Sequence, residues 1–186
     1  NADLMVNFDK RFGNFSVIAN FGAATTSFKW NNVSGSSGYF SIPHLIALGN
    51  GNNQTTSEGY SKKRVNSILG NATVGYKSMA YLDFTARNDW SSTLPANNWS
   101  YFYPSVSLSG IISEMVKLPE QISYWKIRGS YAQVGNDTNP YRLLSVYTLD
   151  KTNGAILNAT AATTFPLTTL KPEDTRSFEI GTEYKM

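Results

Sequence analysis

The sequence predicts an all-β fold of antiparallel strands, and three observations lead to this prediction. Apolar and polar residues alternate with a period of two in seven separate runs, a pattern that the longer period of a helix cannot produce. Aromatic residues make up 13% of the chain and charged residues only 16%, a composition that favours strands over a disordered chain. The segments between the runs are rich in Gly, Ser and Asn, which favour turns and loops.

The first two predicted strands, 3–9 and 15–21, form an N-terminal hairpin. In the first strand, Leu4, Val6 and Phe8 alternate with polar residues. In the second strand, apolar residues occupy every other position from residue 15, with one further isoleucine on the polar side. The short connection between the two runs predicts a tight turn.

The third and fourth predicted strands, 67–76 and 80–90, are joined by a tight turn at Lys77 and Ser78. The fourth strand has the clearest alternation. Its even positions are apolar from Ala80 to Trp90 except for one asparagine, and its odd positions are polar and include three charged residues. This pattern predicts one apolar face and one polar face.

The last three strands are predicted at 102–113, 125–131 and 177–185. In the first of them, serines at the odd positions oppose apolar residues at the even ones. In the other two, aromatic and aliphatic residues alternate with Lys, Arg, Ser and Glu. A weaker pattern at Leu144–Thr148 predicts a separate small hairpin within the last long connection.

The connections alternate in length along the chain. Those after the first, third and fifth strands are short, whereas Gly22–Asn66 and Asn136–Thr175 are long and Asp89–Ser100 is intermediate. Short turns on one side and long loops on the other are typical of an outer-membrane β-barrel. Long structureless loops are uncommon in compact soluble domains. The loop lengths therefore favour a transmembrane barrel.

The placement of the large aromatic residues also favours a barrel. In a membrane barrel the apolar face meets lipid and the polar face lines a wet interior, with aromatic girdles at both interfaces. Aromatic residues lie near the predicted strand ends on the apolar faces: Tyr76, Trp90, Phe102, Trp125 and Tyr184. The alternative is a β-sandwich or small barrel, a surface module that recognises carbohydrate on aromatic loops.

An odd number of strands predicts that the sheet does not close within this sequence. Seven antiparallel strands would begin and end on opposite sides, whereas bacterial single-chain barrels have an even number. An open edge is not tolerated in a membrane. We therefore expect residues 1–186 to be an arc of a larger barrel, with neighbouring strands outside the sequence.

Composition excludes several kinds of chemistry. The chain has no cysteine and one histidine, His44, so thiol chemistry and sites built on paired histidines are ruled out. No apolar run reaches the ~18 residues of a membrane helix. The basic residues are scattered, which argues against a nucleic-acid partner. The oxygen-rich segment 136–139 lacks the ligand spacing of a known calcium loop. We therefore expect no enzyme activity and no cofactor.

Two groups of residues are candidates for contact with a solute. Charged residues on the predicted polar faces are candidates for lining the barrel lumen: Asp83, Arg87, Asp89, Lys126, Arg128, Glu179 and Glu183. They would either bind a polar solute or line a wet wall that touches a plug. Aromatic residues on the long-loop side are candidates for external contact with a substrate or a lid protein: Trp30, Tyr39, Phe40, Trp99 and Tyr101.

Four segments, in order, resemble the SusC/RagA family of TonB-dependent outer-membrane transporters of Bacteroidetes-type bacteria. Residues 87–92 (RNDWSS) resemble the family's Arg-x-Asp-x-Ser-Ser strand end, and residues 103–108 (YPSVSL) resemble its Phe-Pro-Ser-Val-Ser strand start. Residues 126–136 (KIRGSYAQVGN) are similar to its Leu-Arg-x-Ser-Tyr-Gly-x-x-Gly-Asn strand. The segment 170–181 is similar to its Leu-x-Pro-Glu segment and next strand. Gly110 departs from the aromatic residue that we would expect there.

The resemblance implies a barrel of about 22 strands, of which residues 1–186 would be one part of the barrel domain, without the plug. It implies import of a glycan or oligopeptide across the outer membrane of a Gram-negative cell. It also implies three kinds of partner: a SusD-like substrate-binding lipoprotein as a lid, the TonB complex acting through the plug, and the lipid and lipopolysaccharide around the barrel.

Overall fold

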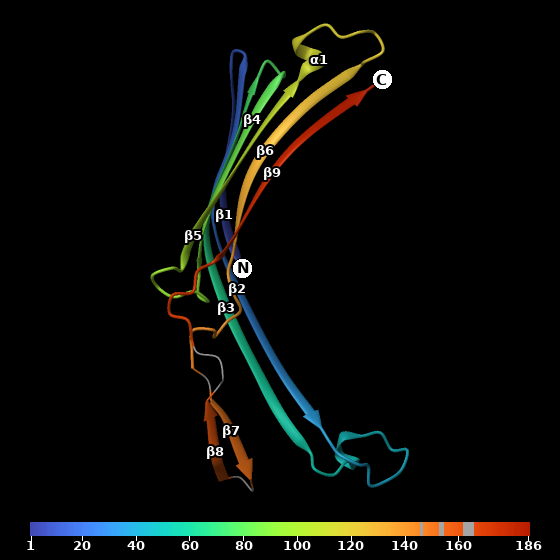
Figure 1. The fold of residues 1–186 in the computed structure, drawn as a ribbon, viewed down its shortest axis with the longest axis vertical. Helices are drawn as coiled ribbons and strands as arrows, with labels where there is room; N and C mark the ends of the chain where they lie inside the picture. The colour runs from blue at the N-terminus through green and yellow to red at the C-terminus, as the bar shows by residue number, and fades with distance from the viewer. Residues whose placement is uncertain (146, 153–154, 162–165) are drawn as a thin grey trace. The chain divides into compact units, whose positions relative to one another are not determined.

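A computed structural model of the chain, which describes residues 1–145, 147–152, 155–161 and 166–186, confirms the all-β prediction. Seven strands form one antiparallel sheet in which chain neighbours are also spatial neighbours (Figure 1). The sheet is open, with β1 and β9 at its edges. Its strands are β1 (Ala2–Phe12), β2 (Phe15–Ser36), β3 (Thr55–Tyr76), β4 (Ala80–Ser91), β5 (Ser100–Ile111), β6 (Tyr124–Asn136) and β9 (Glu173–Lys185).

The chain divides into two compact units. Unit 1 comprises residues 1–26 and 64–186, and unit 2 comprises residues 27–63. Strands β2 and β3 contribute residues to both units.

In unit 1 the strand register places apolar residues in continuous rows across the sheet. One row runs Phe84, Val106, Tyr131 and Phe178 on strands β4, β5, β6 and β9. These four side chains are all exposed. Because residues directly opposite each other share one face of a sheet, the alternation read from the sequence gives this sheet one continuous apolar face and one polar face.

Unit 2 is a hairpin formed by the far halves of β2 and β3. Hydroxyl pairs join the two strands, with 2.7 Å between Ser34 Oγ and Ser57 Oγ and 2.7 Å between Ser36 Oγ and Thr55 Oγ1. The connecting loop includes a short 3₁₀ helix, η1 (Leu48–Asn50).

The long loop predicted at Gly22–Asn66 is therefore shorter in the structure, because residues at both of its ends belong to strands. Strand β2 continues to Ser36 and β3 begins at Thr55. Most side chains in these extensions are exposed. Because neither face is covered, the apolar–polar alternation that identifies a strand is absent from them.

The fifth strand begins and ends two residues earlier than predicted, at Ser100 and Ile111. Strand β5 ends at Ile111, and Ile112–Met115 forms a single helical turn, α1, instead of continuing to residue 113. Pairing with β4 ends at the Ala80–Gly110 pair, and the Ile111 N–H donates to the Met79 carbonyl at 2.7 Å. Beyond this bond β4 offers no further partner, so the chain turns.

The small hairpin in the last long connection exists but lies further along than predicted. Strands β7 (Tyr147–Thr152) and β8 (Ala155–Ala161) form a separate two-stranded sheet. The prediction had centred this hairpin on Leu144–Thr148, of which residue 146 lies outside the described residues. The separate sheet leaves the main sheet with the seven strands predicted.

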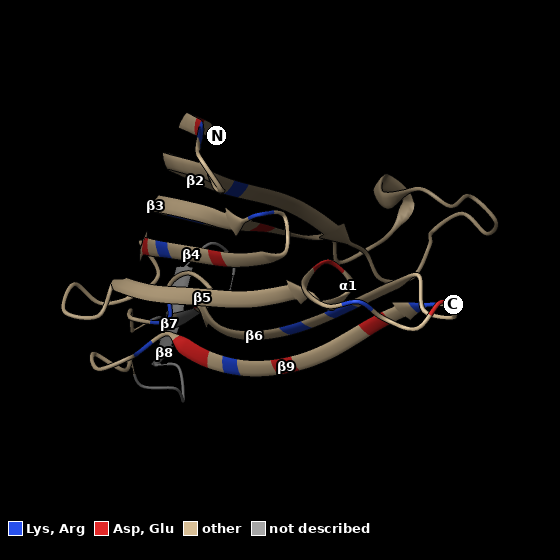
Figure 2. Ribbon diagram, turned by 90° about the horizontal axis from the view of Figure 1, so that it is seen from above, with Lys and Arg blue, Asp and Glu red and all other residues tan. Residues whose placement is uncertain are grey.

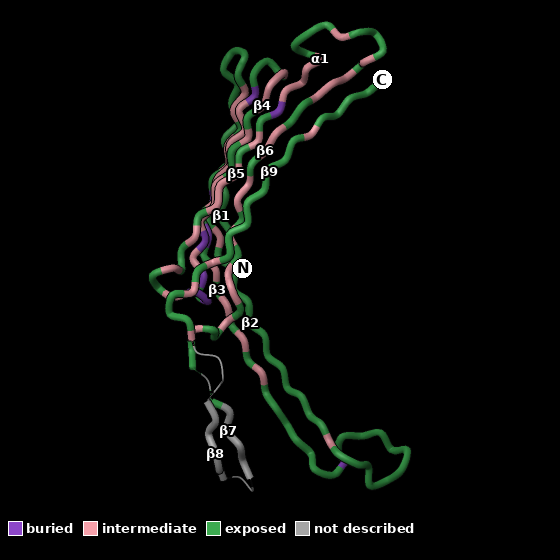
Figure 3. The backbone as a smooth tube through the Cα atoms, in the orientation of Figure 1, coloured by how far each residue is buried: buried purple, intermediate pink, exposed green. Residues whose placement is uncertain are grey.

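The distribution of burial differs from that of a soluble β-sandwich. Within the described residues, Leu94 is the one apolar residue that is buried, whereas five polar residues are buried on or beside β3, β4 and β5 (Figure 3). The buried polar residues are Ser67, Asp89, Ser91, Thr93 and Ser109. A sandwich would bury apolar side chains between two sheets, so that alternative fold is wrong. No helix among the described residues is long and apolar enough to span a membrane.

Candidate functional site: the polar face of the sheet

Three of the predicted lumen residues lie on one face of β4, whose charged residues are coloured in Figure 2. Asp83 lies opposite Thr73 of β3, whose hydroxyl donates to the Asp83 carboxylate at 2.6 Å. Arg87 and Asp89 follow on the same face, because side chains two apart on a strand point the same way. The structure brings Arg87 and Asp89 into direct contact and keeps Asp83 in a separate bond.

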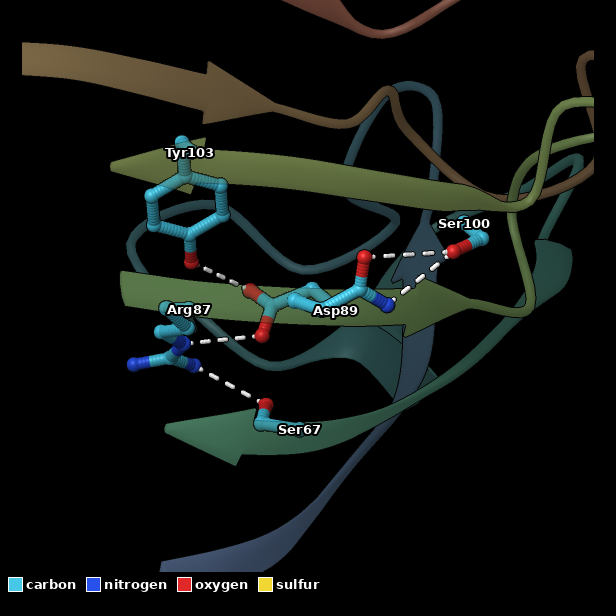
Figure 4. Close-up of polar contacts among 6 residues, drawn as sticks. Ser67, Arg87, Asp89, Ser100 and Tyr103 are labelled. Atoms are coloured by element: carbon cyan, nitrogen blue, oxygen red, sulfur yellow. Dashed lines mark hydrogen bonds and ion pairs between the residues drawn. The ribbon is translucent and has the colours of Figure 1, made fainter. Parts of the chain in front are cut away.

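Asp89 is the centre of a hydrogen-bonded cluster that joins three strands (Figure 4). Arg87 Nε donates to Asp89 Oδ1 at 2.8 Å, and the Tyr103 hydroxyl donates to Asp89 Oδ2 at 2.6 Å. Arg87 Nη2 also donates to Ser67 Oγ at 3.0 Å. Asp89 is only 5% exposed, and a buried carboxylate needs such partners because burial of an unpaired charge is costly.

Tyr101 and Tyr103 form a pair of stacked rings on β5. Their centroids are 5.8 Å apart and their planes differ by 21°. A Cβ added to Gly135 of β6 would lie 2.5 Å from the Tyr101 ring, so the ring lies closely against this glycine. Glycine is required there because a side chain would displace the ring. The pair therefore presents half-buried aromatic surface with a fixed orientation.

A second polar cluster closes the end of β4. The Ser91 hydroxyl donates to the Asp137 carboxylate, and Thr93 Oγ1 donates to the same carboxylate oxygen at 3.3 Å. Ser91 and Thr93 are 0% and 3% exposed. Asp137 is the acidic residue of the oxygen-rich segment 136–139, so two hydroxyl groups already occupy one of its oxygens.

The loop 92–99 between β4 and β5 holds both ends of the connection between β6 and β9. At one end, Thr93 and the adjoining Ser91 bind Asp137, just after β6. At the other, the Asn98 side chain donates to the Leu170 carbonyl at 3.1 Å, just before β9. The end of β4 is also tied to β3, because the Ser92 N–H donates to the Arg64 carbonyl at 2.9 Å.

The charged residues of β6 and β9 include one pair that lies directly opposite. The register places Lys126 opposite Glu183, and Glu179 opposite Ser130. Arg128 lies over Gly181, where an added Cβ would be 2.8 Å from its Nε. Lys126, Arg128 and Glu183 also line a small polar hollow together with Thr182. This register places both signs of charge on the same part of the sheet.

The predicted external aromatic residues fall into both units. Tyr39 and Phe40 lie in the loop of unit 2, where Tyr39 is 88% exposed. Trp30 is a strand residue of β2, and its ring lies against Gly59. In unit 1, Trp99 is an exposed residue of the β4–β5 loop. Tyr101, by contrast, lies on β5 in the stacked pair described above. His44 is exposed in the loop of unit 2.

The sequence is similar to that of a known receptor. Over 86 residues, 45% of this chain, it is 34% identical to TonB-dependent receptor P26 from Formosa agariphila and covers 9% of that protein. No protein-family model matches the chain.

The fold is similar to solved structures of the RagAB peptide importer. The match to its closed-closed state has a TM-score of 0.82 with 20% identity and covers 98% of this chain and 21% of that one. The match to its open-open state has a TM-score of 0.74 with 22% identity and covers 97% of this chain and 20% of that one. The fold that the resemblance to the SusC/RagA family implies is therefore confirmed. This chain spans about a fifth of the length of the RagAB chains that it matches.

The geometry gives a physical reason for one motif of the sequence. In the run RNDWSS, Arg87 and Asp89 bind each other, Ser91 binds Asp137, and the Ser92 hydroxyl accepts the Arg64 N–H at 2.9 Å. Arg87, Asp89 and Ser91, which alternate along the strand, thus all form hydrogen bonds on the polar face. The motif could be found in the sequence, but its partners could not.

The residues of this site that sequence reasoning missed are all uncharged except one. Ser67 gave no signal beyond its polar position on a strand, and Thr93 gave none because it lies in the loop after β4. Ser91 and Tyr103 were noted only within the motifs RNDWSS and YPSVSL, and Asp137 only as part of an oxygen-rich segment. Within the residues that the structure describes, no group of three or more His, Asp or Glu could hold a metal ion. The contacts described at this site are hydrogen bonds and ion pairs between neighbouring strands and loops.

We expect Asp137→Ala to loosen the connection between β6 and β9 at its first residue. The change removes the acceptor that two buried hydroxyl groups share. Because these hydroxyls lie 2.9 Å apart, one can still donate to the other, and the remaining donor is left unpaired at a cost of about 1–3 kcal/mol. Hydrogen–deuterium exchange should become faster in residues 92–99 and at the start of the connection. Asp174→Ala is the control, because Asp174 forms an exposed ion pair with Arg176 at 3.0 Å, a type of contact that contributes little. Equal exchange in both variants would contradict the assigned role of Asp137.

Proposed function

We propose that this chain forms part of the wall of an outer-membrane barrel that takes up a nutrient, a glycan or an oligopeptide, in a TonB-dependent manner. The observation that carries the proposal is the sheet itself, which exposes a continuous apolar face and places its hydrogen-bonded polar residues on the other. A membrane barrel meets lipid with the first kind of face and water with the second. The likeness to a TonB-dependent receptor and to the RagAB importer supports the same assignment.

In this proposal the polar face lines the path of the solute. Asp83, Arg87, Asp89 and the charged residues of β6 and β9 keep the wall wet and offer contacts to the solute and to a plug. The stacked Tyr101 and Tyr103 rings offer a flat apolar surface on the same wall. Passage requires no bond to be made or broken, so the proposed function needs no catalytic residue and no cofactor.

The proposed partners are a SusD-like lipoprotein at the long-loop side and the TonB complex, which would act through a plug. The loop of unit 2 supports a protein contact, because Tyr39 and Ile46 are 88% and 87% exposed. Large exposed apolar residues that lie together mark interaction surfaces. We propose that these residues, with Trp30 and Phe40, contact the lipoprotein or the substrate.

The proposal is tested in the bacterium that carries the gene for the full-length protein. The protein should leave the outer membrane only with detergent, and its gel migration should change on heating, as barrels show. Deletion of the gene should abolish growth on one glycan or one oligopeptide as the limiting nutrient, and depletion of TonB should reproduce the loss. A protein that stays soluble without detergent, or a deletion strain that grows normally on every glycan and oligopeptide tested, would contradict the proposal.

A further inference from the structure

Three aromatic rings and two lysines gather at the short-turn end of the apolar face. The Phe15 and Tyr76 ring centroids are 4.9 Å apart. Lys10 Nζ lies 5.2 Å from the Phe12 centroid, and Lys77 Nζ lies 5.4 Å from the Tyr76 centroid. Both distances are within the range of a cation–π contact. We call these five residues the Lys10–Lys77 cluster.

The cluster is built on two turns that are bonded to each other. Phe12 and Phe15 face each other across the β1–β2 turn. The Lys77 N–H, in the β3–β4 turn, donates to the Asn14 carbonyl in the β1–β2 turn at 2.8 Å. This bond fixes the rings from the two hairpins side by side, although each ring remains 39–51% exposed. The cluster is therefore an ordered surface that presents two positive charges.

The β3–β4 turn has a lysine at a position that does not suit it. Lys77 and Ser78 have φ of 48° and 59°, and the Met79 N–H donates to the Tyr76 carbonyl at 2.9 Å. A turn with two positive central φ angles favours Asn-Gly or Asp-Gly. Asparagine at position 77 would suit the backbone better than lysine does, and an unfavourable backbone position is a reason to look for a role of the side chain.

We propose that the Lys10–Lys77 cluster binds the phosphate of an anionic phospholipid in the membrane leaflet on the short-turn side. The inference rests on the proposed function, because it requires the sheet to span a membrane. Aromatic rings favour the interface between lipid and water. Lysine side chains extend along apolar surface and place their charge at the same level. An ammonium group above a ring still has N–H groups free to donate to phosphate oxygens. Two such ammonium groups, those of Lys10 and Lys77, flank the rings.

The apolar face also provides room for the lipid tail. A shallow apolar groove lies further along the sheet, lined by the small residues Gly70, Ala72 and Ala86 together with Phe21 and Phe84. Gly70 is six residues from Tyr76, or about 20 Å along the strand. A headgroup at the cluster would therefore direct its acyl chain into the groove.

The test uses the full-length protein, purified in detergent and shown to be folded by heat-modifiable migration. Native mass spectrometry measures binding of a phosphatidylglycerol of defined chain length. We expect Lys77→Asn to weaken binding about fivefold, as for one lysine near an anionic lipid surface, and Lys10→Gln to weaken it similarly. Lys77→Asn should also raise the temperature of unfolding, because asparagine suits the turn. Opposite changes in stability and lipid binding would not arise from simple damage to the turn.

Two controls accompany the cluster variants. Lys77→Arg keeps the charge and should keep the binding. Lys117→Asn removes a lysine from the β5–β6 connection, also at the short-turn end, and should leave binding unchanged. The inference would be overturned if Lys117→Asn and Lys77→Asn lost lipid binding equally, or if Lys77→Asn bound lipid normally. It would also be overturned if inorganic phosphate alone abolished the difference in lipid binding between Lys77→Asn and the unchanged protein. A full-length protein that needs no detergent would instead overturn the proposed membrane barrel.

Discussion

Replacing Asp89 by alanine is expected to lower the free energy of unfolding by about 3 kcal/mol, the lower end of the cost of breaking a buried ion pair. The Asp89 side chain is 7% exposed, and its two oxygens accept from Arg87 and Tyr103. Without them, the Tyr103 hydroxyl and the Arg87 Nε lose their acceptor. The cost lies at the lower end because the Arg87 side chain is 41% exposed and its guanidinium can turn toward water.

The measurement is the denaturant midpoint of the full-length protein in detergent, followed by tryptophan fluorescence. Asp83→Ala is the matched control on the same strand and face. It removes one hydrogen bond, to Thr73 at 2.6 Å, and should cost about 1 kcal/mol. Tyr103→Phe removes one donor of the Asp89 cluster and should lie between the two. An Asp89→Ala midpoint equal to that of Asp83→Ala would show that the cluster does not stabilise the sheet.

Most strands could be predicted from the sequence because each has one apolar and one polar face. Strand β4 is predicted at 80–90 and observed at Ala80–Ser91. The extensions of β2 and β3 in unit 2 could not be predicted, because both of their faces are exposed. There the strands are held by main-chain bonds and by hydroxyl pairs such as Ser34 with Ser57, which leave no periodic signal.

The candidate site could be predicted in part for a similar reason. Arg87 and Asp89 are two apart on one strand, so alternation alone places them on one face. Ser67 and Tyr103 come from the neighbouring strands, and finding them requires the register, which depends on turns and long-range pairing. Asp137 is 46 residues from Ser91 in sequence. No local pattern links the two, so this contact became visible only in the fold.

Replacing Phe84 by lysine is expected to make folding into a bilayer less favourable by about 2–4 kcal/mol, as for a lysine near the midplane on the lipid face of a barrel. Phe84 lies near the middle of β4, is 49% exposed, and belongs to the row with Val106, Tyr131 and Phe178. If water covered this face, the same change at an exposed position would have a small effect, within about 0.5 kcal/mol. The size of the effect therefore identifies the medium that covers the apolar face.

Thr85→Lys is the matched control, because Thr85 is the next residue of β4 and points to the polar face. It lies opposite Asn71 and Ser105, so a lysine there would meet polar neighbours and water. The fraction of full-length protein that folds into lipid vesicles, read from heat-modifiable migration, should fall sharply for Phe84→Lys and little for Thr85→Lys. If Thr85→Lys were the more damaging change, the faces would be assigned the wrong way round. If neither change had an effect, the sheet would not face lipid at all, because a lysine on either side of a strand would then be hydrated.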